Sequence, residues 1–236
     1  MRHLAALAFA CFALSACGGG EDGESESSQF QRAIEPQAQE RAESVLLTSS
    51  DFPAGWQTEP ADPEDDLDGD EAFNDCIGVD YSDFTLIGEA ESDDFLGEQA
   101  ERASSESEVF ENEEAAADAI SELTEGFGSD EASTCMNEML GEFEDEEVAI
   151  TKAELQELDF TAPPGVDDAN GWRIAFTIEG KEGTQSEGAT AVAYIDLIQI
   201  RSGETTAELS TLDVEQPFDA EMRDELLGVV ADRLSE

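Results

Sequence analysis

Three consecutive segments between residues 172 and 214 decide the fold: "WRIAFTIEG" (172–180), "ATAVAYIDLIQIR" (189–201) and "ETTAELSTLDV" (204–214). In the first, apolar side chains occupy every second position from Trp172 to Ile178, a pattern that predicts a strand with one buried face. The second is apolar on both faces, so we expect it at the centre of a sheet. Because Ser202 and Gly203 form a turn between the second and the third, we expect hairpins of an antiparallel meander.

The elements before and after this stretch complete an α+β domain. Further strands are expected at "EVAITKAELQELDF" (147–160) and "EQAERASSESEVFE" (98–111), which gives about 4–5 strands. Helices are predicted over 37–47, 112–127, 130–140 and 219–234, with Asn112 and Asp219 as N-caps. Since strands and helices are segregated along the chain, we expect an antiparallel sheet with helices packed on one face, in a single domain over 33–236.

The N-terminus has the features of a secretory signal. Arg2 precedes an apolar run over 4–16, which is shorter than the roughly 20 residues needed to span a bilayer. "LSAC" (14–17) resembles the bacterial lipobox, in which the cysteine carries lipid and becomes the new N-terminus. We therefore predict a lipoprotein signal peptide over 1–16 and a lipidated Cys17 that anchors the mature chain to the bacterial cell membrane, outside the cytoplasm. The alternative is an ordinary signal peptide with a chance cysteine. Residues 17–32, rich in Gly, Ser and acids, are expected to form a flexible acidic tether.

The charge of the chain excludes one large class of partners. There are 60 acidic residues against 10 basic ones, a net charge of −50, which excludes nucleic-acid binding because that requires clustered Lys and Arg. Two explanations remain: adaptation of the whole protein to high salt, which we favour, or a specific role for carboxylates such as binding cations. Salt adaptation predicts that the thermal midpoint rises with added NaCl, which screens self-repulsion.

Cys76 and Cys135 are expected to form a disulfide, because disulfides persist in exported proteins and Cys17 is assigned to lipid. The chain-entropy model gives about 4 kcal/mol for closing a loop of this size. Two separate buried thiols are the alternative.

The residue inventory argues against catalysis. His3 is the sole histidine and leaves with the signal peptide, so the usual general base and most zinc sites are excluded from the mature chain. No glycine-rich phosphate loop is present, and paired carboxylates cannot be singled out among so many acids. Of the two tryptophans, we expect Trp172 in the core and consider Trp56 the better candidate for a pocket edge, although packing is favoured there too.

The acidic loop over 64–75 matches part of a calcium-binding pattern. Its carboxylates and Gly69 have some of the spacing of an EF-hand loop, but position 8 is Glu71 and position 12 is Asp75 instead of Glu. We therefore predict no metal and no cofactor.

The order of elements is similar to the extracytoplasmic sensor domains of PknH-type actinobacterial kinases and their free-standing lipoprotein relatives. The resemblance covers most of residues 38–236 and rests on "LLTSSDFPAGW" (46–56), Cys76 beyond a loop, "ERASSESEVFENEEAAADAI" (101–120), Cys135 in the next helix, and the closing hairpin and helix. The chain departs from it in having one cysteine pair where two are expected. Actinobacterial lipoproteins with a PsbP-like fold are also similar. The resemblance implies ligand or partner sensing outside the cell and carries no ligand residues over.

Three classes of function follow. We expect a sensor-like or ligand-binding module without catalysis, bound to the membrane through its lipid and to a small molecule or an envelope protein. A structural or protein-interaction lipoprotein is the main alternative, and a carboxylate-based hydrolase is the third.

Overall fold

A single sheet forms the centre of the computed structural model, which describes residues 30–61, 73–140, 148–181 and 183–236. In these residues the sheet has nine strands, seven of them in the spatial order β1-β3-β5-β9-β8-β7-β6, with β2 and β4 at the side of β5. The strands are β1 (Gln31–Arg32), β2 (Gln57–Glu59), β3 (Thr85–Glu91), β4 (Asp94–Leu96), β5 (Arg102–Phe110), β6 (Val148–Glu157), β7 (Asp168–Gly180), β8 (Thr190–Ser202) and β9 (Thr205–Val214). The helices are α1 (Pro36–Val45), α3 (Glu113–Phe127), α4 (Ala132–Met139) and α5 (Ala220–Leu234), with a 3₁₀ turn at Ser49–Asp51 and a further helical segment over 73–77.

The predicted meander is present. Strands β6, β7, β8 and β9 are antiparallel neighbours in chain order, and β8 lies between β7 and β9 as its two apolar faces require. The register places Trp172 opposite Leu197 and Leu197 opposite Ser210. The α+β class is therefore confirmed.

Four strands on the other side of the sheet were not predicted. β3 and β4 extend the antiparallel part, whereas β1 pairs with β3 in parallel, so the sheet is mixed. Gln31–Arg32, which the sequence assigned to the tether, thus belongs to the sheet, and the domain begins before residue 33. A Cβ at Gly88 of β3 would lie 2.4 Å from the backbone of Ala38, so the missing side chain lets α1 approach β3 closely.

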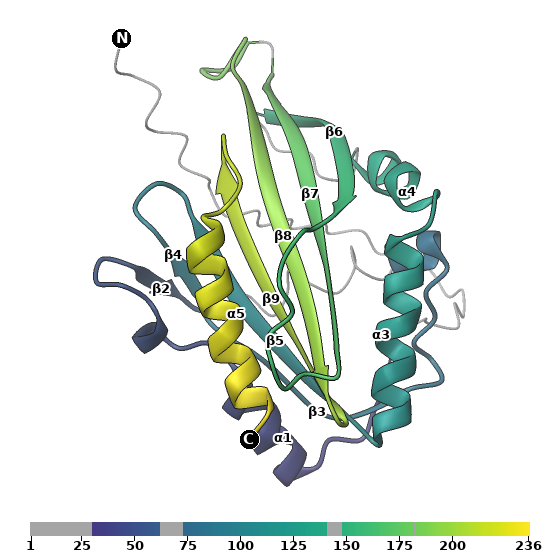
Figure 1. Cartoon of the computed structure of the whole chain (residues 1–236). Coiled ribbons are helices and arrows are strands. Elements are labelled where there is room, and N and C mark those ends of the chain that lie inside the picture. Colours follow the sequence, from purple (N-terminus) through teal and green to yellow (C-terminus); the bar gives the residue numbers. More distant parts are fainter. Residues whose placement is uncertain (1–29, 62–72, 141–147, 182) are drawn as a thin grey trace, which may run out of the picture.

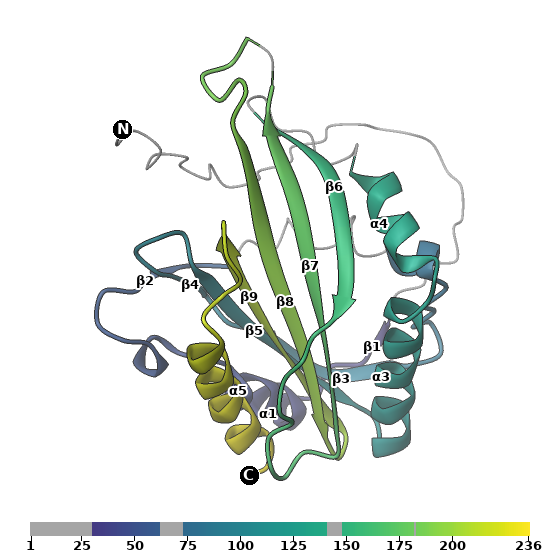
Figure 2. The same cartoon turned by 45° about the horizontal axis from the view of Figure 1, so that its top comes forward.

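The helices lie on both faces of the sheet, which corrects the expectation of one face. Neighbouring residues of a strand point to opposite faces. On β8, Ile198 and Ile200 pack with α5, whereas Leu197 packs with α3. α1 lies with α5, because Ala38 and Ala42 pack on Val109 of β5. In Figures 1 and 2, α5 and α3 lie on opposite sides of the long strands β7 to β9.

Both N-caps were predicted and are observed. The Asn112 side chain accepts a hydrogen bond from the Ala115 amide at 3.0 Å, and the Asp219 side chain accepts one from the Met222 amide at 2.9 Å. Each satisfies a helix donor that has no partner within the first turn.

Charged groups fasten α1 and α5 to their face of the sheet. Asp196 of β8 is 1 % exposed and lies between Arg173 of β7 (2.5 Å) and Arg223 of α5 (3.1 Å). Arg41 of α1 donates to the carbonyls of Arg233 (3.0 Å) and Leu234 (2.5 Å), which caps the C-terminus of α5. In return, Arg233 donates to the Leu46 carbonyl and pairs with Asp51 at 2.9 Å.

A disulfide joins Cys76 to Cys135, as predicted, with Cα atoms 5.8 Å apart. It links the helical segment over 73–77 to α4, on the α3 face of the sheet. Within the described residues, no helix is both long enough and apolar enough to cross a membrane.

Candidate functional site

A cleft of about 550 Å³ lies between α3 and the sheet. Its floor is formed by the face of β5, β8 and β9 that is turned away from α5, and α3 supplies one wall through Ala119, Ile120, Leu123 and Phe127. Phe30 and Tyr81 line it as well, with their rings stacked at a centroid distance of 4.3 Å. This volume falls within the range of small-molecule sites, roughly 300–1,000 Å³.

One part of the cleft is apolar. Trp172 of β7 stacks on Phe127 of α3 with ring centroids 5.7 Å apart, and Leu123, Ile195 and Leu197 line the same region. The Trp172 indole Nε1 is buried and has no hydrogen-bond partner among the described residues. The predicted core position of Trp172 is thus correct in part, because its ring both packs on α3 and forms the lining of the cleft.

The adjoining part of the floor is acidic. Cross-strand register places Glu91 opposite Glu106 and Glu106 opposite Glu208, so three glutamates form a row across β3, β5 and β9. Glu89 lies opposite Glu108 in the next row. These five glutamates, all in the lining of the cleft, are called the carboxylate floor below.

Within the carboxylate floor, the Glu108 carboxyl has a raised pKa. Burial raises the pKa of its carboxyl to about 7, against the lowering effect of a 3.3 Å hydrogen bond from the Thr206 hydroxyl. Glu208 on β9 and Glu89 on β3 raise the pKa further, whereas Arg32 on β1 lowers it. The α3 wall presents apolar side chains to this part of the cleft.

Two arginines lie at the edges of the cleft, and each has an acidic partner. Arg32 of β1 pairs with Glu89 of β3 at 2.9 Å, and Arg102 of β5 pairs with Asp94 of β4 through its Nε at 2.7 Å. The lining therefore contains six carboxylates and two guanidinium groups.

Gln199 of β8 is next to the carboxylate floor. It lies opposite Glu208, and its Nε2 donates to a Glu208 carboxylate oxygen at 3.1 Å. Its Oε1 is buried and has no partner among the described residues, a state that costs about 1–3 kcal/mol.

Some of the residues singled out in the sequence lie near this cleft, and others lie away from it. The disulfide is near its edge, since Phe73 and Asn74 of the same helical segment line it. Trp56, a candidate for the pocket edge at which packing was the favoured expectation, does pack: its ring lies 4.8 Å from that of Phe52, in the core under α5. Cys17, the signal peptide over 1–16 and most of the acidic loop over 64–75 lie outside the described residues. Among the residues that the structure describes, no group of three or more His, Cys, Asp and Glu side chains is arranged to hold a metal ion.

The carboxylate floor was missed in the sequence, although a signal for it existed. Glu106 and Glu108 alternate with Ser105 and Ser107 along β5, and the serines face the buried α1 side. The glutamates therefore had to share the opposite face. Their neighbours on β3 and β9 depend on the register, which no local pattern in those strands shows.

Comparison with known proteins gives one structural neighbour. No protein-family model matches the chain, and no curated protein is significantly similar to it. The crystal structure of the extracellular domain of PknH from Mycobacterium tuberculosis matches 86 % of this chain and 98 % of that domain, with a TM-score of 0.40 and 12 % sequence identity. The neighbour is of the type that the sequence resembles, and at this TM-score we base no argument on it.

Proposed function

We propose that this protein is a ligand-binding module whose ligand occupies the cleft between α3 and the sheet. The observation that carries the proposal is the lining of the cleft, where aromatic walls meet a few polar groups on rigid strands. Binding sites for small molecules combine these two features, because apolar walls contribute affinity and fixed polar groups contribute orientation. A sensor-like role follows if occupancy of the cleft is reported to a partner.

The surface gives less support to a protein-interaction lipoprotein. Ile34, at 45 % exposed, is the exposed large hydrophobic side chain of the described residues. Stable protein interfaces usually have a larger apolar patch at their centre. A cleft for a small ligand therefore accounts for more of the described surface than a docking face does.

The arrangement of the carboxylates does not favour the hydrolase. Glycoside cleavage needs two carboxyl groups that flank the bond from opposite sides. The carboxylate floor occupies neighbouring strands of one wall, and the α3 wall opposite it presents Ala119, Ile120 and Leu123.

We further propose that the module works outside the cytoplasm on a lipid anchor at Cys17. The disulfide supports this location, since such bonds persist in oxidising compartments. In cells producing the Cys17→Ser variant, the protein should be released from membranes, whereas the wild type stays bound. Equal membrane retention of the two would contradict the anchor and leave the cleft proposal unaffected.

The test of the ligand-binding proposal is a thermal-shift screen with a blocked cleft as its control. Compounds that bind the folded state raise the thermal midpoint because they stabilise that state. At a concentration one hundred times the dissociation constant, the unfolding free energy increases by about 2.7 kcal/mol. Ser104→Trp fills the floor of the cleft, and Thr58→Trp adds the same side chain on exposed β2. We expect Ser104→Trp to abolish the shifts and Thr58→Trp to retain them.

Two results would overturn the ligand-binding proposal. One is a set of ligands whose shifts survive Ser104→Trp, which would place binding outside the cleft. The other is a screen without any shift, together with co-purification of another envelope protein, which would favour the interaction lipoprotein.

A further inference from the structure

The lining of the cleft has an excess of negative charge that its own basic residues cannot balance. Six carboxylates face two guanidinium groups there, and no lysine or histidine is part of the lining. Arg32 and Arg102 are paired with Glu89 and Asp94 at the edges. A ligand that enters this cleft therefore meets a negative potential, which walls of low dielectric strengthen.

The general acidity of the chain does not account for where these carboxylates lie. An acidic surface adapted to salt keeps its charges in solvent. In the carboxylate floor, Glu91 and Glu106 are exposed, whereas Glu89, Glu108 and Glu208 are only partly exposed. Like charges directly opposite each other on paired strands destabilise a sheet, and the row Glu91–Glu106–Glu208 contains two such pairs. Carboxylates kept at that disadvantage inside a cleft are typical of a binding site.

An apolar surface lies next to the carboxylate floor, two residues further along the strands. The row that contains Glu208 and Gln199 is two residues from the row that contains Ser210, Leu197 and Trp172, a separation of about 7 Å. Leu123 and Phe127 of α3 line the cleft as well. A molecule that touches both rows needs a positive group at one end and an apolar body of about the size of a phenyl ring at the other.

These two surfaces exclude a bare metal ion as the best occupant. No carboxylates of the described residues are grouped closely enough to coordinate a metal, and nearly half of the lining residues are aromatic or aliphatic. We propose that the cleft selects an organic ammonium ion with an apolar body, held by the carboxylate floor at its charged end and by Trp172, Leu197 and Phe127 at the other. This inference rests on the proposed function, since it names the ligand class of the same cleft.

Titration of Glu108 should make the affinity of the cleft for a cation depend on pH. Arg32 on β1, Glu89 on β3, Glu106 on β5 and Glu208 on β9 are the charged groups that face this part of the floor, and α3 adds none. Since the Glu108 carboxyl has a pKa of about 7, it gains its charge between pH 6 and pH 8. Affinity for a cation that stays protonated over this range should rise across it, and Glu108→Gln should remove the rise.

The first experiment varies the ligand and leaves the protein unchanged. Isothermal titration of the purified full chain compares phenethylammonium with phenethyl alcohol and 3-phenylpropionate, which share the ring and differ in charge. We expect phenethylammonium to bind at least about tenfold more tightly than either, because a charged hydrogen bond is worth about 1.5–3 kcal/mol. Calcium chloride is titrated in parallel and is expected not to compete.

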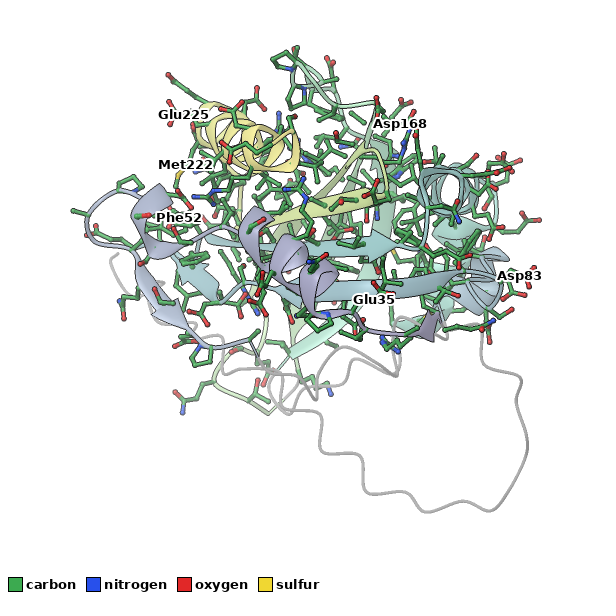
Figure 3. All side chains as sticks on the ribbon, turned by 90° about the horizontal axis from the view of Figure 1, so that it is seen from below. Glu35, Phe52, Asp83, Asp168, Met222 and Glu225 are labelled. Atoms are coloured by element: carbon green, nitrogen blue, oxygen red, sulfur yellow. A yellow bond between two sulfur atoms is a disulfide. The ribbon has the colours of Figure 1, made fainter. Side chains whose placement is uncertain are left out.

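The second experiment locates the binding. The chain contains two tryptophans, so Trp56→Phe leaves Trp172 as a single fluorophore in the cleft, and its emission should change when phenethylammonium binds. Glu106→Gln and Glu208→Gln should each weaken binding by about tenfold. Glu225→Gln on the exposed side of α5, on the opposite face (Figure 3), removes the same charge and should change nothing. Circular dichroism establishes that each variant is folded.

The outcomes separate this inference from the proposed function. If the alcohol or the carboxylate binds as tightly as the ammonium ion, or if Glu225→Gln weakens binding as much as Glu106→Gln, the preference for cations is wrong. Screening hits that are neutral or anionic and are abolished by Ser104→Trp would likewise overturn the inference while the ligand-binding cleft stands. If no compound binds in the cleft, both the ligand-binding proposal and the preference for ammonium ions are wrong.

Discussion

The two faces of the sheet use charge in opposite ways. On the α1 and α5 face, four of the chain's ten basic side chains join elements: Arg41 joins α1 to α5, Arg173 joins β7 to β8, Arg223 joins α5 to β8, and Arg233 joins α5 to the segment after α1. On the α3 face, the carboxylate floor remains in excess over its arginines, and the helix leaves a cleft beside the sheet. In a chain with a net charge of −50, the few basic side chains on this face thus lie where they link helices and strands to one another. The difference teaches that the paired face contributes stability, whereas the acidic face leaves the cleft in which we propose that a ligand binds.

The largest effect is expected from breaking the buried network of the paired face. Asp196→Asn keeps the shape of the side chain but leaves Arg173 and Arg223 without a counter-charge, so unfolding free energy should fall by about 3–5 kcal/mol in urea titration. Asp224→Asn removes the exposed partner of Arg223 and should cost less than about 1 kcal/mol. Equal losses from the two variants would show that burial of the network adds nothing.

The next effect concerns the link that holds the edge of the acidic face. Replacing both Cys76 and Cys135 with alanine frees the helical segment over 73–77 from α4. Stability should fall by about 2–4 kcal/mol, and the response of Trp172 fluorescence to cleft ligands should weaken, because Phe73 and Asn74 line the cleft. Addition of a reductant to the wild type serves as the control, since it should reproduce both changes. An unchanged response of Trp172 would restrict the disulfide to a role in stability.

A smaller effect, of opposite sign, is expected at Glu108. Its folded-state pKa of about 7 is above the ordinary value of 4.5, so the carboxyl supports folding below about pH 4.5 and loses that contribution as pH rises to 7. Glu108→Gln should therefore raise unfolding free energy at pH 8 by about 1–3 kcal/mol and flatten the pH dependence between 5 and 8. A loss of stability at pH 8 would mean that the Glu108 charge is stabilised, not strained, in the fold.

Salt should produce the smallest change. Added NaCl screens the repulsion among exposed carboxylates more than it screens the buried Asp196 network, so the thermal midpoint should rise by a few degrees from low to molar salt. The gain should be smaller in Glu108→Gln than in the wild type. A constant or falling midpoint would contradict adaptation to salt.

The parts of the fold that local patterns predict are those with strong periodicity. Alternation from Trp172 to Ile178, the two apolar faces of β8 and the caps at Asn112 and Asp219 all led to elements that are present. The same two apolar faces of β8 also required helices on both sides of the sheet, an implication that the one-face expectation overlooked.

The elements that escaped prediction depend on distant parts of the chain. β3 contains Gly88, which weakens a strand pattern, and its glycine is explained only by the approach of Ala38. β1 has two residues and forms by pairing with Thr85 and Leu86. The carboxylate floor likewise arises when β3, β5 and β9 bring their glutamates into register, and no single segment among 60 acids shows that arrangement.

The reciprocal arginines at the two ends of the domain also set the order in which it can assemble. Arg41 finds its acceptors only at Arg233 and Leu234, and Arg233 in turn reaches back to Asp51. Similarly, β5 needs β9, about a hundred residues later, to complete its hydrogen bonds. A chain that is still being synthesised therefore lacks the α5 carbonyls that bind Arg41 of α1, and it lacks β9, which pairs with β5. These contacts of α1 and β5 therefore form only after the C-terminal part of the chain has been synthesised.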